Sequence, residues 1–161
     1  MINILLKYSI LLVFGVIEAS CSNHKLPAGF SELEKEPVIF PDYSGVTIPP
    51  NIAPLNFIIK EVGEKYTVNI SSEKGGKIVI SQSNPDIRID VSDWKNLLAS
   101  NKGKELNIEV FCQNNGKWIK YKNFKLNVAG EEIDSYLSYR LINSAYVMWF
   151  EMGLYQRNLE N

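Results

Sequence analysis

Most of the chain between residues 55 and 128 alternates between apolar and polar positions with a period of two. The side chains of a β-strand point alternately to the two faces of a sheet, so this pattern predicts strands with one buried face. The inward-facing positions that it predicts are Tyr66, Val68 and Ile70, then Ile87, Ile89 and Val91, then Leu106, Ile108, Val110 and Cys112, and finally Phe124, Leu126 and Val128.

Turn-forming residues separate these stretches. Gly75-Gly76 follows the second strand, and Asn114-Asn115-Gly116 lies between two apolar runs. An Asn-Gly pair favours a two-residue β-hairpin, because a type I′ turn needs positive φ at both central residues. Short strands at regular spacing, with no long helix between them, predict a mainly β domain over residues 37–130. The expected fold is an immunoglobulin- or fibronectin type III-like antiparallel β-sandwich, with a small barrel as the alternative.

One short helix interrupts the strands. Trp94, Leu97 and Leu98 have helical spacing, and Ser92 precedes them as the expected N-cap.

The N-terminus has the parts of an export signal. Lys7 precedes an apolar run over residues 10–17, and the small residues Ala19 and Ser20 lead to Cys21. The run is shorter than the roughly 20 residues that a membrane-spanning helix requires. The arrangement resembles a bacterial lipobox, although Glu18 stands where lipoboxes prefer an aliphatic residue. We therefore expect residues 1–20 to be a signal peptide and Cys21 to be lipidated. An ordinary cleaved signal and an uncleaved anchor are the alternatives.

Residues 21–36 show no sustained period, and they predict a flexible tether between the lipidated cysteine and the sandwich. If Cys21 carries lipid, Cys112 has no partner for a disulfide within the chain. Its place in the alternating pattern favours a buried thiol that acts as a small hydrophobe.

Residues 131–161 are rich in aromatic and aliphatic side chains and are too apolar for a free tail. They predict one or two helical segments that form a docking surface, either for the sandwich itself or, as favoured here, for a domain outside this chain. The residues expected to contact that partner are Tyr139, Trp149, Phe150 and Tyr155.

The charge and composition of the chain argue against several classes of function. The chain has 17 basic and 18 acidic residues, so it lacks the basic excess expected of a nucleic-acid-binding protein. Its single histidine, His24, lies in the tether, which argues against histidine-based catalysis and histidine-ligated metals. Asp86, Asp90 and Asp93 form a carboxylate group that is better explained by a solvated strand face and a helix start. We expect no cofactor, no metal and no enzymatic activity.

Several stretches resemble a family of Bacteroidetes lipoproteins that continue into a TolB-like β-propeller. The similar stretches are residues 40–43, 46–49, 51–57, 133–134, 136–137, 139–142 and 152–157, together with Trp94 and Leu97-Leu98. Some members of that family carry a CxxCH haem-attachment motif and are labelled cytochrome c biogenesis proteins, but this chain has neither CxxCH nor propeller repeats.

The resemblance implies an N-terminal spacer or docking module of a cell-envelope lipoprotein, on the periplasmic side or in the outer membrane. The alternative is a glycan-binding lipoprotein of a polysaccharide-uptake system. Such a protein needs an exposed platform of coplanar aromatic rings. Trp118 and Tyr121 are the nearest candidates, but the alternation places them on opposite faces.

Overall fold

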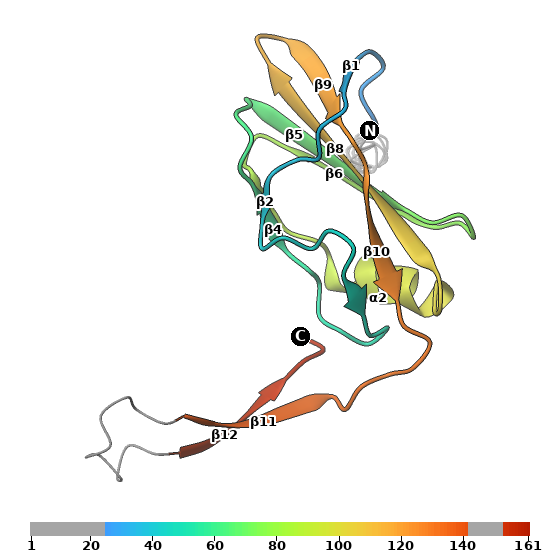
Figure 1. The fold of residues 1–161 in the computed structure, drawn as a ribbon, viewed down its shortest axis with the longest axis vertical. Helices are drawn as coiled ribbons and strands as arrows, with labels where there is room; N and C mark the ends of the chain where they lie inside the picture. The colour runs from blue at the N-terminus through green and yellow to red at the C-terminus, as the bar shows by residue number, and fades with distance from the viewer. Residues whose placement is uncertain (1–24, 142–152) are drawn as a thin grey trace, which may run out of the picture.

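The computed structural model describes residues 25–141 and 153–161 and shows a mainly β chain with three sheets and one helix in that part (Figure 1). The signal segment and Cys21 lie outside the described residues. The elements in chain order are β1 (Ser31–Leu33), β2 (Ile39–Phe40), β3 (Thr47–Ile48), β4 (Phe57–Ile59), β5 (Lys65–Ser71), β6 (Lys77–Gln82), β7 (Asp86–Ile87), α2 (Val91–Ser100), β8 (Glu105–Asn114), β9 (Lys117–Tyr121), β10 (Phe124–Val128), β11 (Tyr136–Leu141) and β12 (Gly153–Asn158).

The largest sheet has seven strands and is built around β8. One edge of β8 pairs antiparallel with β5, which in turn pairs with β6. The other edge is shared by β9 and β10, both antiparallel to β8. Beyond them, β1 runs parallel to β9, and β3 runs parallel to β10.

Strands β9 and β10 act as one strand with an interruption. Phe111 pairs with Lys120, whereas Ile108 pairs with Phe124, so one extra residue is accommodated between the two pairings. This is the arrangement of a β-bulge, which bends a strand and frees backbone groups from the ladder. A freed group, the Lys122 N–H, donates to the Lys35 carbonyl oxygen at 3.0 Å.

The hairpin between β8 and β9 has the predicted geometry. Asn115 and Gly116 form a two-residue connection with φ values of 49° and 73°. Both values are positive, as a type I′ turn requires, which confirms the prediction.

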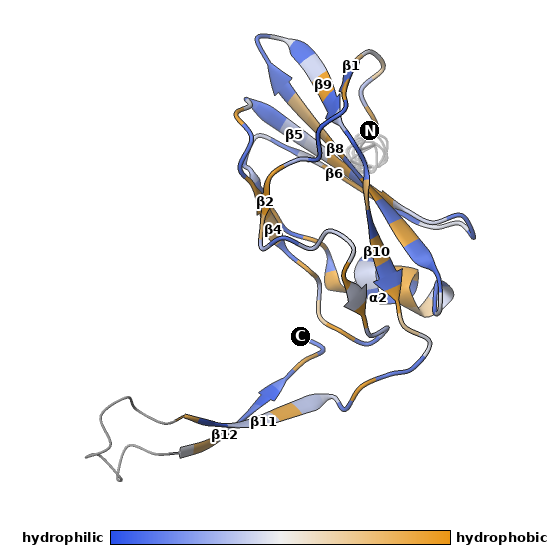
Figure 2. Cartoon of the chain, viewed as in Figure 1, coloured by the Kyte–Doolittle hydropathy of each residue, from blue (hydrophilic) through white to orange (hydrophobic). Residues whose placement is uncertain are grey.

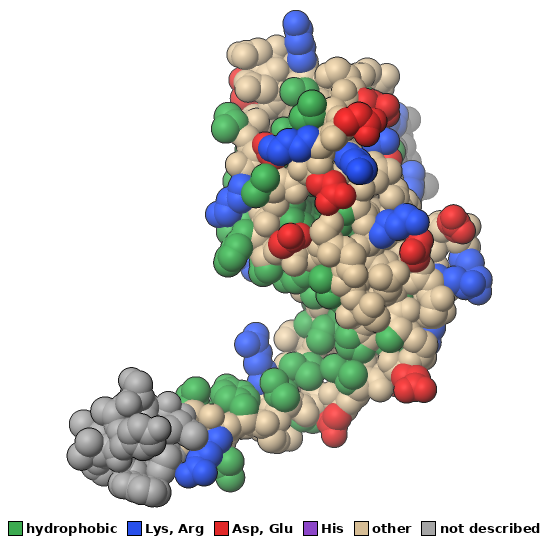
Figure 3. All heavy atoms as spheres, in the orientation of Figure 1, with side chains coloured by type: hydrophobic (Ala, Val, Ile, Leu, Met, Phe, Trp, Pro, Cys, Tyr) green, Lys and Arg blue, Asp and Glu red, His purple; other side chains and the backbone are tan. Residues whose placement is uncertain are grey.

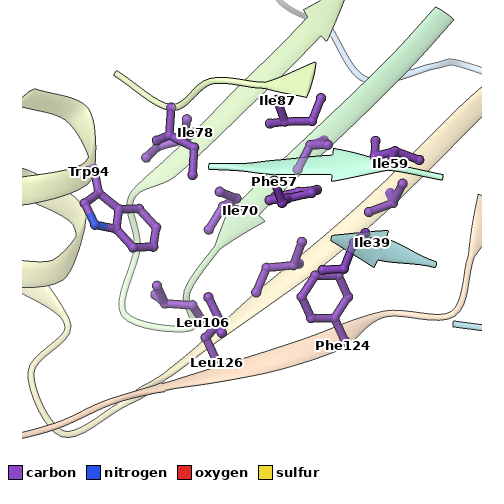
Figure 4. Close-up of a cluster of buried hydrophobic side chains, with 14 of the residues drawn as sticks. Ile39, Phe57, Ile59, Ile70, Ile78, Ile87, Trp94, Leu106, Phe124 and Leu126 are labelled. Carbon is purple, nitrogen blue, oxygen red and sulfur yellow. The ribbon is translucent and has the colours of Figure 1, made fainter. Parts of the chain in front are cut away.

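The core lies between the large sheet and a three-stranded sheet in the order β2-β4-β7 (Figure 4). Ile39, Phe57, Ile59 and Ile87 come from the small sheet. They face buried residues of the large sheet: Tyr66, Val68, Ile70, Ile78, Leu106, Ile108, Val110, Cys112, Tyr121, Phe124, Leu126 and Val128. The predicted inward positions of β5, β8 and β10 are therefore confirmed.

Helix α2 closes one end of this core with Trp94, Leu97 and Leu98, as the helical spacing predicted. The N-cap, however, is Asp90 and not Ser92. The Asp90 carboxylate accepts from the backbone amides of Ser92 and Asp93 at 2.8 and 3.0 Å. The expectation that Val91 points inward was also wrong. Because the helix begins at Val91, the strand alternation stops before it and its side chain is 43% exposed.

The prediction that residues 131–161 form helical segments is wrong for the described part. Residues 136–141 and 153–158 form β11 and β12, an antiparallel hairpin that projects away from the sandwich (Figure 1). Leu137 and Leu141 are four positions apart, which suits a helix, but Tyr139 lies between them and completes an alternating strand face. Colouring by hydropathy shows apolar and polar residues interspersed along both strands (Figure 2).

The expectation of a flexible tether over residues 21–36 is wrong for its second half. Residues 31–33 form β1, and all three are exposed because the strand lies at the edge of the sheet. A fully exposed edge strand carries no alternating burial pattern, so β1 could not be predicted from hydrophobic periodicity. We refer to residues 25–36 as the strap.

Candidate functional site

The most unusual surface of the described chain is one face of the β11–β12 hairpin. Residues that pair directly across two antiparallel strands share a face. Tyr139 pairs with Tyr155, and Leu137 and Leu141 lie two positions to either side of Tyr139, so all four side chains lie on this face. They are 40–51% exposed. Figure 3 shows apolar side chains along the hairpin and at the point where it leaves the sandwich. We call these four residues the hairpin face.

An aromatic pair organises the hairpin face. The rings of Tyr139 and Tyr155 are stacked, with their centroids 5.8 Å apart and an interplanar angle of 21°. The Tyr155 ring also lies over Gly153, where a Cβ atom would come within 2.8 Å of it. Glycine at position 153 therefore lets the Tyr155 ring lie flat against the strand.

The opposite face of the hairpin is also partly apolar. Tyr136 is 50% exposed and Leu154 is 86% exposed. Among the described residues, neither β11 nor β12 has a second neighbouring strand. Within residues 25–141 and 153–161, the hairpin therefore presents apolar side chains on two faces and two edges that no further strand covers. An isolated two-stranded hairpin is marginally stable in water, so this element gains from a covering surface.

Polar contacts fix the base of the hairpin to the sandwich. The Asn51 side-chain amide donates to the Ile133 carbonyl oxygen at 2.8 Å and accepts from the Ile133 N–H at 3.1 Å. Asn51 also donates to the Glu160 carboxylate at 3.2 Å, and the Ser135 hydroxyl donates to the same oxygen at 2.6 Å. The Ala53 N–H donates to the Leu159 carbonyl oxygen at 2.7 Å. Both strands of the hairpin are thus tied to the loop that follows β3.

These hydrogen bonds hold the pKa of the Glu160 carboxyl below its ordinary value, with Ser135 as the main cause and Asn51 as the second. The carboxylate therefore stays charged as an acceptor at neutral pH.

Two of the four predicted docking residues, Tyr139 and Tyr155, are brought together on the hairpin face. Trp149 and Phe150 lie outside the described residues, as does the predicted lipidation site Cys21. Sequence reasoning did not identify Leu137, Leu141 or Asn51 as members of this site. A two-residue period over 137–141 was the available signal for the leucines, whereas nothing local marks Asn51, which lies 82 positions before Ile133.

A second cluster surrounds the free thiol of Cys112, which is buried as predicted. Burial raises the pKa of the Cys112 thiol to about 12, and the negative charge of Glu61 contributes. The Tyr121 hydroxyl donates to the Glu61 carboxylate at 3.3 Å. Burial and the charge of Glu61 raise the pKa of Tyr121 to about 12 as well.

Glu61 itself stays ionised. Burial works against its charge, but hydrogen bonds from the Val38 N–H and from Lys35 together hold its pKa below the ordinary value. The thiol and the phenol of this cluster are protonated, and the carboxylate is ion-paired. The cluster therefore serves to pack and hydrogen-bond the edge of the core. Its thiol is not an activated nucleophile.

A surface cleft with a volume of about 680 Å³ is lined mostly by polar and charged residues. It lies beside the β5–β6 loop and is lined by Ser71, Ser72, Glu73, Lys74, Gly103, Lys104, Glu105, Asn107, Lys125, Asn127 and Val128. Lys125 is ion-paired with Glu105 at 2.6 Å. Amide, hydroxyl and ammonium groups can hydrogen-bond a polar ligand, but the lining contains no aromatic ring on which a sugar would stack.

The remaining candidates from the sequence have structural roles. Asp86 forms an ion pair with Arg88 at 2.7 Å, and Asp90 caps α2. Tyr121 is buried, whereas Trp118 pairs with Gln113 on the other face of the sheet, which confirms that the two rings do not form one platform. The described residues include no cluster of three potential metal ligands. In the same part of the chain, no helix has both the length and the hydropathy needed to cross a membrane.

Comparison with known proteins gives no match: no family model, no curated protein and no solved structure is significantly similar to the chain.

Proposed function

We propose that this chain is a lipid-anchored cell-envelope protein in which a non-catalytic, immunoglobulin-like β-sandwich presents the C-terminal hairpin to a partner domain. The observation that carries the docking role is the exposed hairpin face, formed by Leu137, Tyr139, Leu141 and Tyr155, on a hairpin whose base is fixed by Asn51. A rigid base and an uncovered apolar face are the features expected of an interaction element.

Strand order supports the immunoglobulin-like assignment. Immunoglobulin-type domains place strands A, B and E in one sheet and strands C, F and G in the other. Here β2, β4 and β7 make up the small sheet, and β5, β8 and β9 are neighbours in the large one. These strands occupy the A, B, E and C, F, G positions in chain order, with α2 in the connection between E and F.

The anchoring role rests on the sequence alone. A short apolar run followed by Ala19, Ser20 and Cys21 has the order of a lipoprotein signal. A single acyl chain gives only marginal membrane binding, so firm attachment requires the several chains of a mature bacterial lipoprotein.

The proposed partner is a β-rich protein domain with a free sheet edge. Free strand edges bind another strand through backbone hydrogen bonds, while neighbouring side chains supply apolar contacts. The hairpin offers both, on β11 and β12. A β-propeller of the kind found in the family that the sequence resembles is a β-rich domain whose blades end in short strand edges. The polar cleft beside Lys74 gives little support to the glycan-binding alternative, because its lining contains no aromatic platform.

Metabolic labelling tests the anchor. The full chain and its Cys21→Ala variant are expressed in a bacterium that processes lipoproteins, with labelled palmitate in the medium. We expect label and detergent-phase partitioning only in the chain with Cys21. Equal labelling of the two proteins, or none in either, contradicts the lipoprotein proposal.

Dye binding tests the docking face. The chain expressed from Ser22 is compared with a Leu137→Ser/Leu141→Ser variant, using a fluorescent dye that binds apolar surface. We expect the variant to bind less dye and to self-associate less, because two exposed leucines of the hairpin face are gone. Val62→Ser is the matched control, since Val62 is 83% exposed on a loop outside the hairpin. A hairpin variant no different from this control contradicts the docking role.

A further inference from the structure

The strap is bound to the sandwich at several points, which matters for the position of the membrane anchor. Phe30 packs edge-to-face against the buried Phe111, with ring centroids 5.3 Å apart. The Lys120 ammonium group lies 5.7 Å from the centroid of the Phe30 ring. Next along the chain, β1 adds three backbone-paired residues to β9.

Ion pairs extend these contacts. Lys120 lies 2.9 Å from the Glu109 carboxylate and 3.8 Å from that of Glu32 in β1. Further along the strap, Lys35 pairs with Glu61 at 3.2 Å, and its carbonyl oxygen accepts from the bulge at Lys122. The strap is thus held by an aromatic contact, a strand pairing and charged groups.

This attachment shortens the tether. A fully extended chain spans at most about 3.3–3.6 Å per residue, so the segment from Cys21 to Phe30 reaches about 30 Å. Without the strap, the first residue fixed in the sandwich would be near Pro37, and the reach would be about 55 Å. About 25 Å of the tether length that the sequence suggested is therefore absorbed into the fold.

We propose that the strap side of the sandwich rests against the bilayer that holds Cys21, so that the hairpin face points away from it. This inference rests on the proposed lipid anchor. Leu26, Phe30 and Leu33 are 37–43% exposed on the strap, and such side chains suit the membrane interface. The hairpin lies at the other end of the long axis of the molecule (Figure 1). One end thus contacts lipid, and the other is free for a protein partner.

The charge of the strap indicates which lipids it contacts. Its basic residues Lys25 and Lys35 are outnumbered by the acidic Glu32, Glu34 and Glu36. A polybasic segment would favour anionic lipid, but the strap is not polybasic and has no such preference. The contact therefore depends on the acyl chains and the apolar side chains, and zwitterionic phosphatidylcholine is a suitable test membrane.

Fluorescence quenching measures this orientation. The full, lipidated chain is reconstituted into phosphatidylcholine vesicles that contain a nitroxide-labelled lipid. A fluorophore is attached to a cysteine at one of two positions, Lys122→Cys beside the strap or Leu154→Cys on the hairpin. The buried Cys112, with its raised pKa, does not compete for the label. We expect quenching to be several-fold stronger at position 122 than at position 154.

Phe30→Ala removes one attachment of the strap and one of the apolar side chains proposed to contact lipid. Phe30 is 43% exposed and lies outside the sandwich core, so the variant keeps its fold but loses the contact with Phe111. Quenching at position 122 should then fall toward that at position 154. Vesicle flotation is recorded in parallel. If the protein does not float with the vesicles, both the proposed anchor and the proposed orientation are overturned. Protein that floats but shows equal quenching at the two positions, or no effect of Phe30→Ala, overturns the orientation alone.

Discussion

Asn51 binds both backbone groups of Ile133 through one side chain. Its Nδ2 donates to the Ile133 carbonyl oxygen at 2.8 Å, and its Oδ1 accepts from the Ile133 N–H at 3.1 Å. An amide side chain carries a donor and an acceptor side by side, so it can pair with a backbone residue as a neighbouring strand would. This pairing fixes the direction in which the hairpin leaves the sandwich.

We expect Asn51→Ala to loosen the hairpin base without unfolding the sandwich. A hydrogen bond contributes about 0.5–1.5 kcal/mol to stability. Losing this pair should therefore accelerate amide hydrogen exchange at the hairpin base by about tenfold or more. The reporter is the Ala53 amide, which bonds to the Leu159 carbonyl oxygen. Asn96→Ala, on the exposed side of α2, is the control and should leave that amide unchanged. Unaltered exchange at Ala53 in Asn51→Ala would show that Asn51 does not hold the hairpin.

Gly153→Ala should disturb the aromatic pair. The added Cβ would lie 2.8 Å from the Tyr155 ring, so the ring must move away from the strand and from Tyr139. We expect a smaller near-ultraviolet circular dichroism signal from tyrosine. Gly130→Ala is the matched control, because its Cβ would meet nothing within 4 Å. Identical spectra for the two variants would refute this account of the Tyr155 position.

Stability should fall at alkaline pH. The folded chain holds the Cys112 and Tyr121 protons up to a pKa of about 12, whereas the unfolded groups titrate near 9.0 and 10.0. Between these values the unfolded state releases protons first, so the free energy of unfolding decreases as pH rises from about 9 to about 12. Cys112→Val should weaken this dependence in denaturant melts. A melt midpoint that falls equally steeply in the variant would exclude the thiol as a contributor.

Substitutions in the core and on the outer face of the sheet should lower the free energy of unfolding by different amounts. Ile108 is buried in β8, and Ile108→Ala should lower the free energy of unfolding by about 2–5 kcal/mol. Lys120 lies on the outer face of β9, but its side chain is only 18% exposed and pairs with Glu109. Lys120→Ala should therefore cost about 1 kcal/mol, which is more than an exposed lysine would. Urea denaturation measures both, and a neutral Ile108→Ala would mean that β8 is shifted by one residue.

Strong local patterns made the sandwich predictable. The Asn115-Gly116 turn and the alternation around Ile108 each specify backbone geometry within a few residues. The cap of α2 was misplaced because Asp90 and Ser92 both carry suitable oxygen acceptors, and the choice depends on where the helix begins.

The candidate site was less predictable because distant residues form it. Asn51 and Glu160, which meet at the hairpin base, lie 109 positions apart, and no local pattern relates them. The hairpin itself was mistaken for helix because a spacing of four, as between Leu137 and Leu141, fits both periods. Only the intervening Tyr139, which shares their face, separates the two interpretations.

The pairing of β1 with β9 has a consequence for the order of folding. Ser31 and Trp118, joined by a hydrogen bond, are 87 positions apart, whereas the β8–β9 hairpin closes over a two-residue turn. Because hairpins form within about 1–10 μs and distant pairings wait for their partners, we expect β1 to gain protection after β8 and β9 in pulsed hydrogen exchange. The first strand of the described chain would then be among the last to fold. The strap, which leads to the proposed lipidation site, would then join the sheet only after the β8–β9 hairpin has formed.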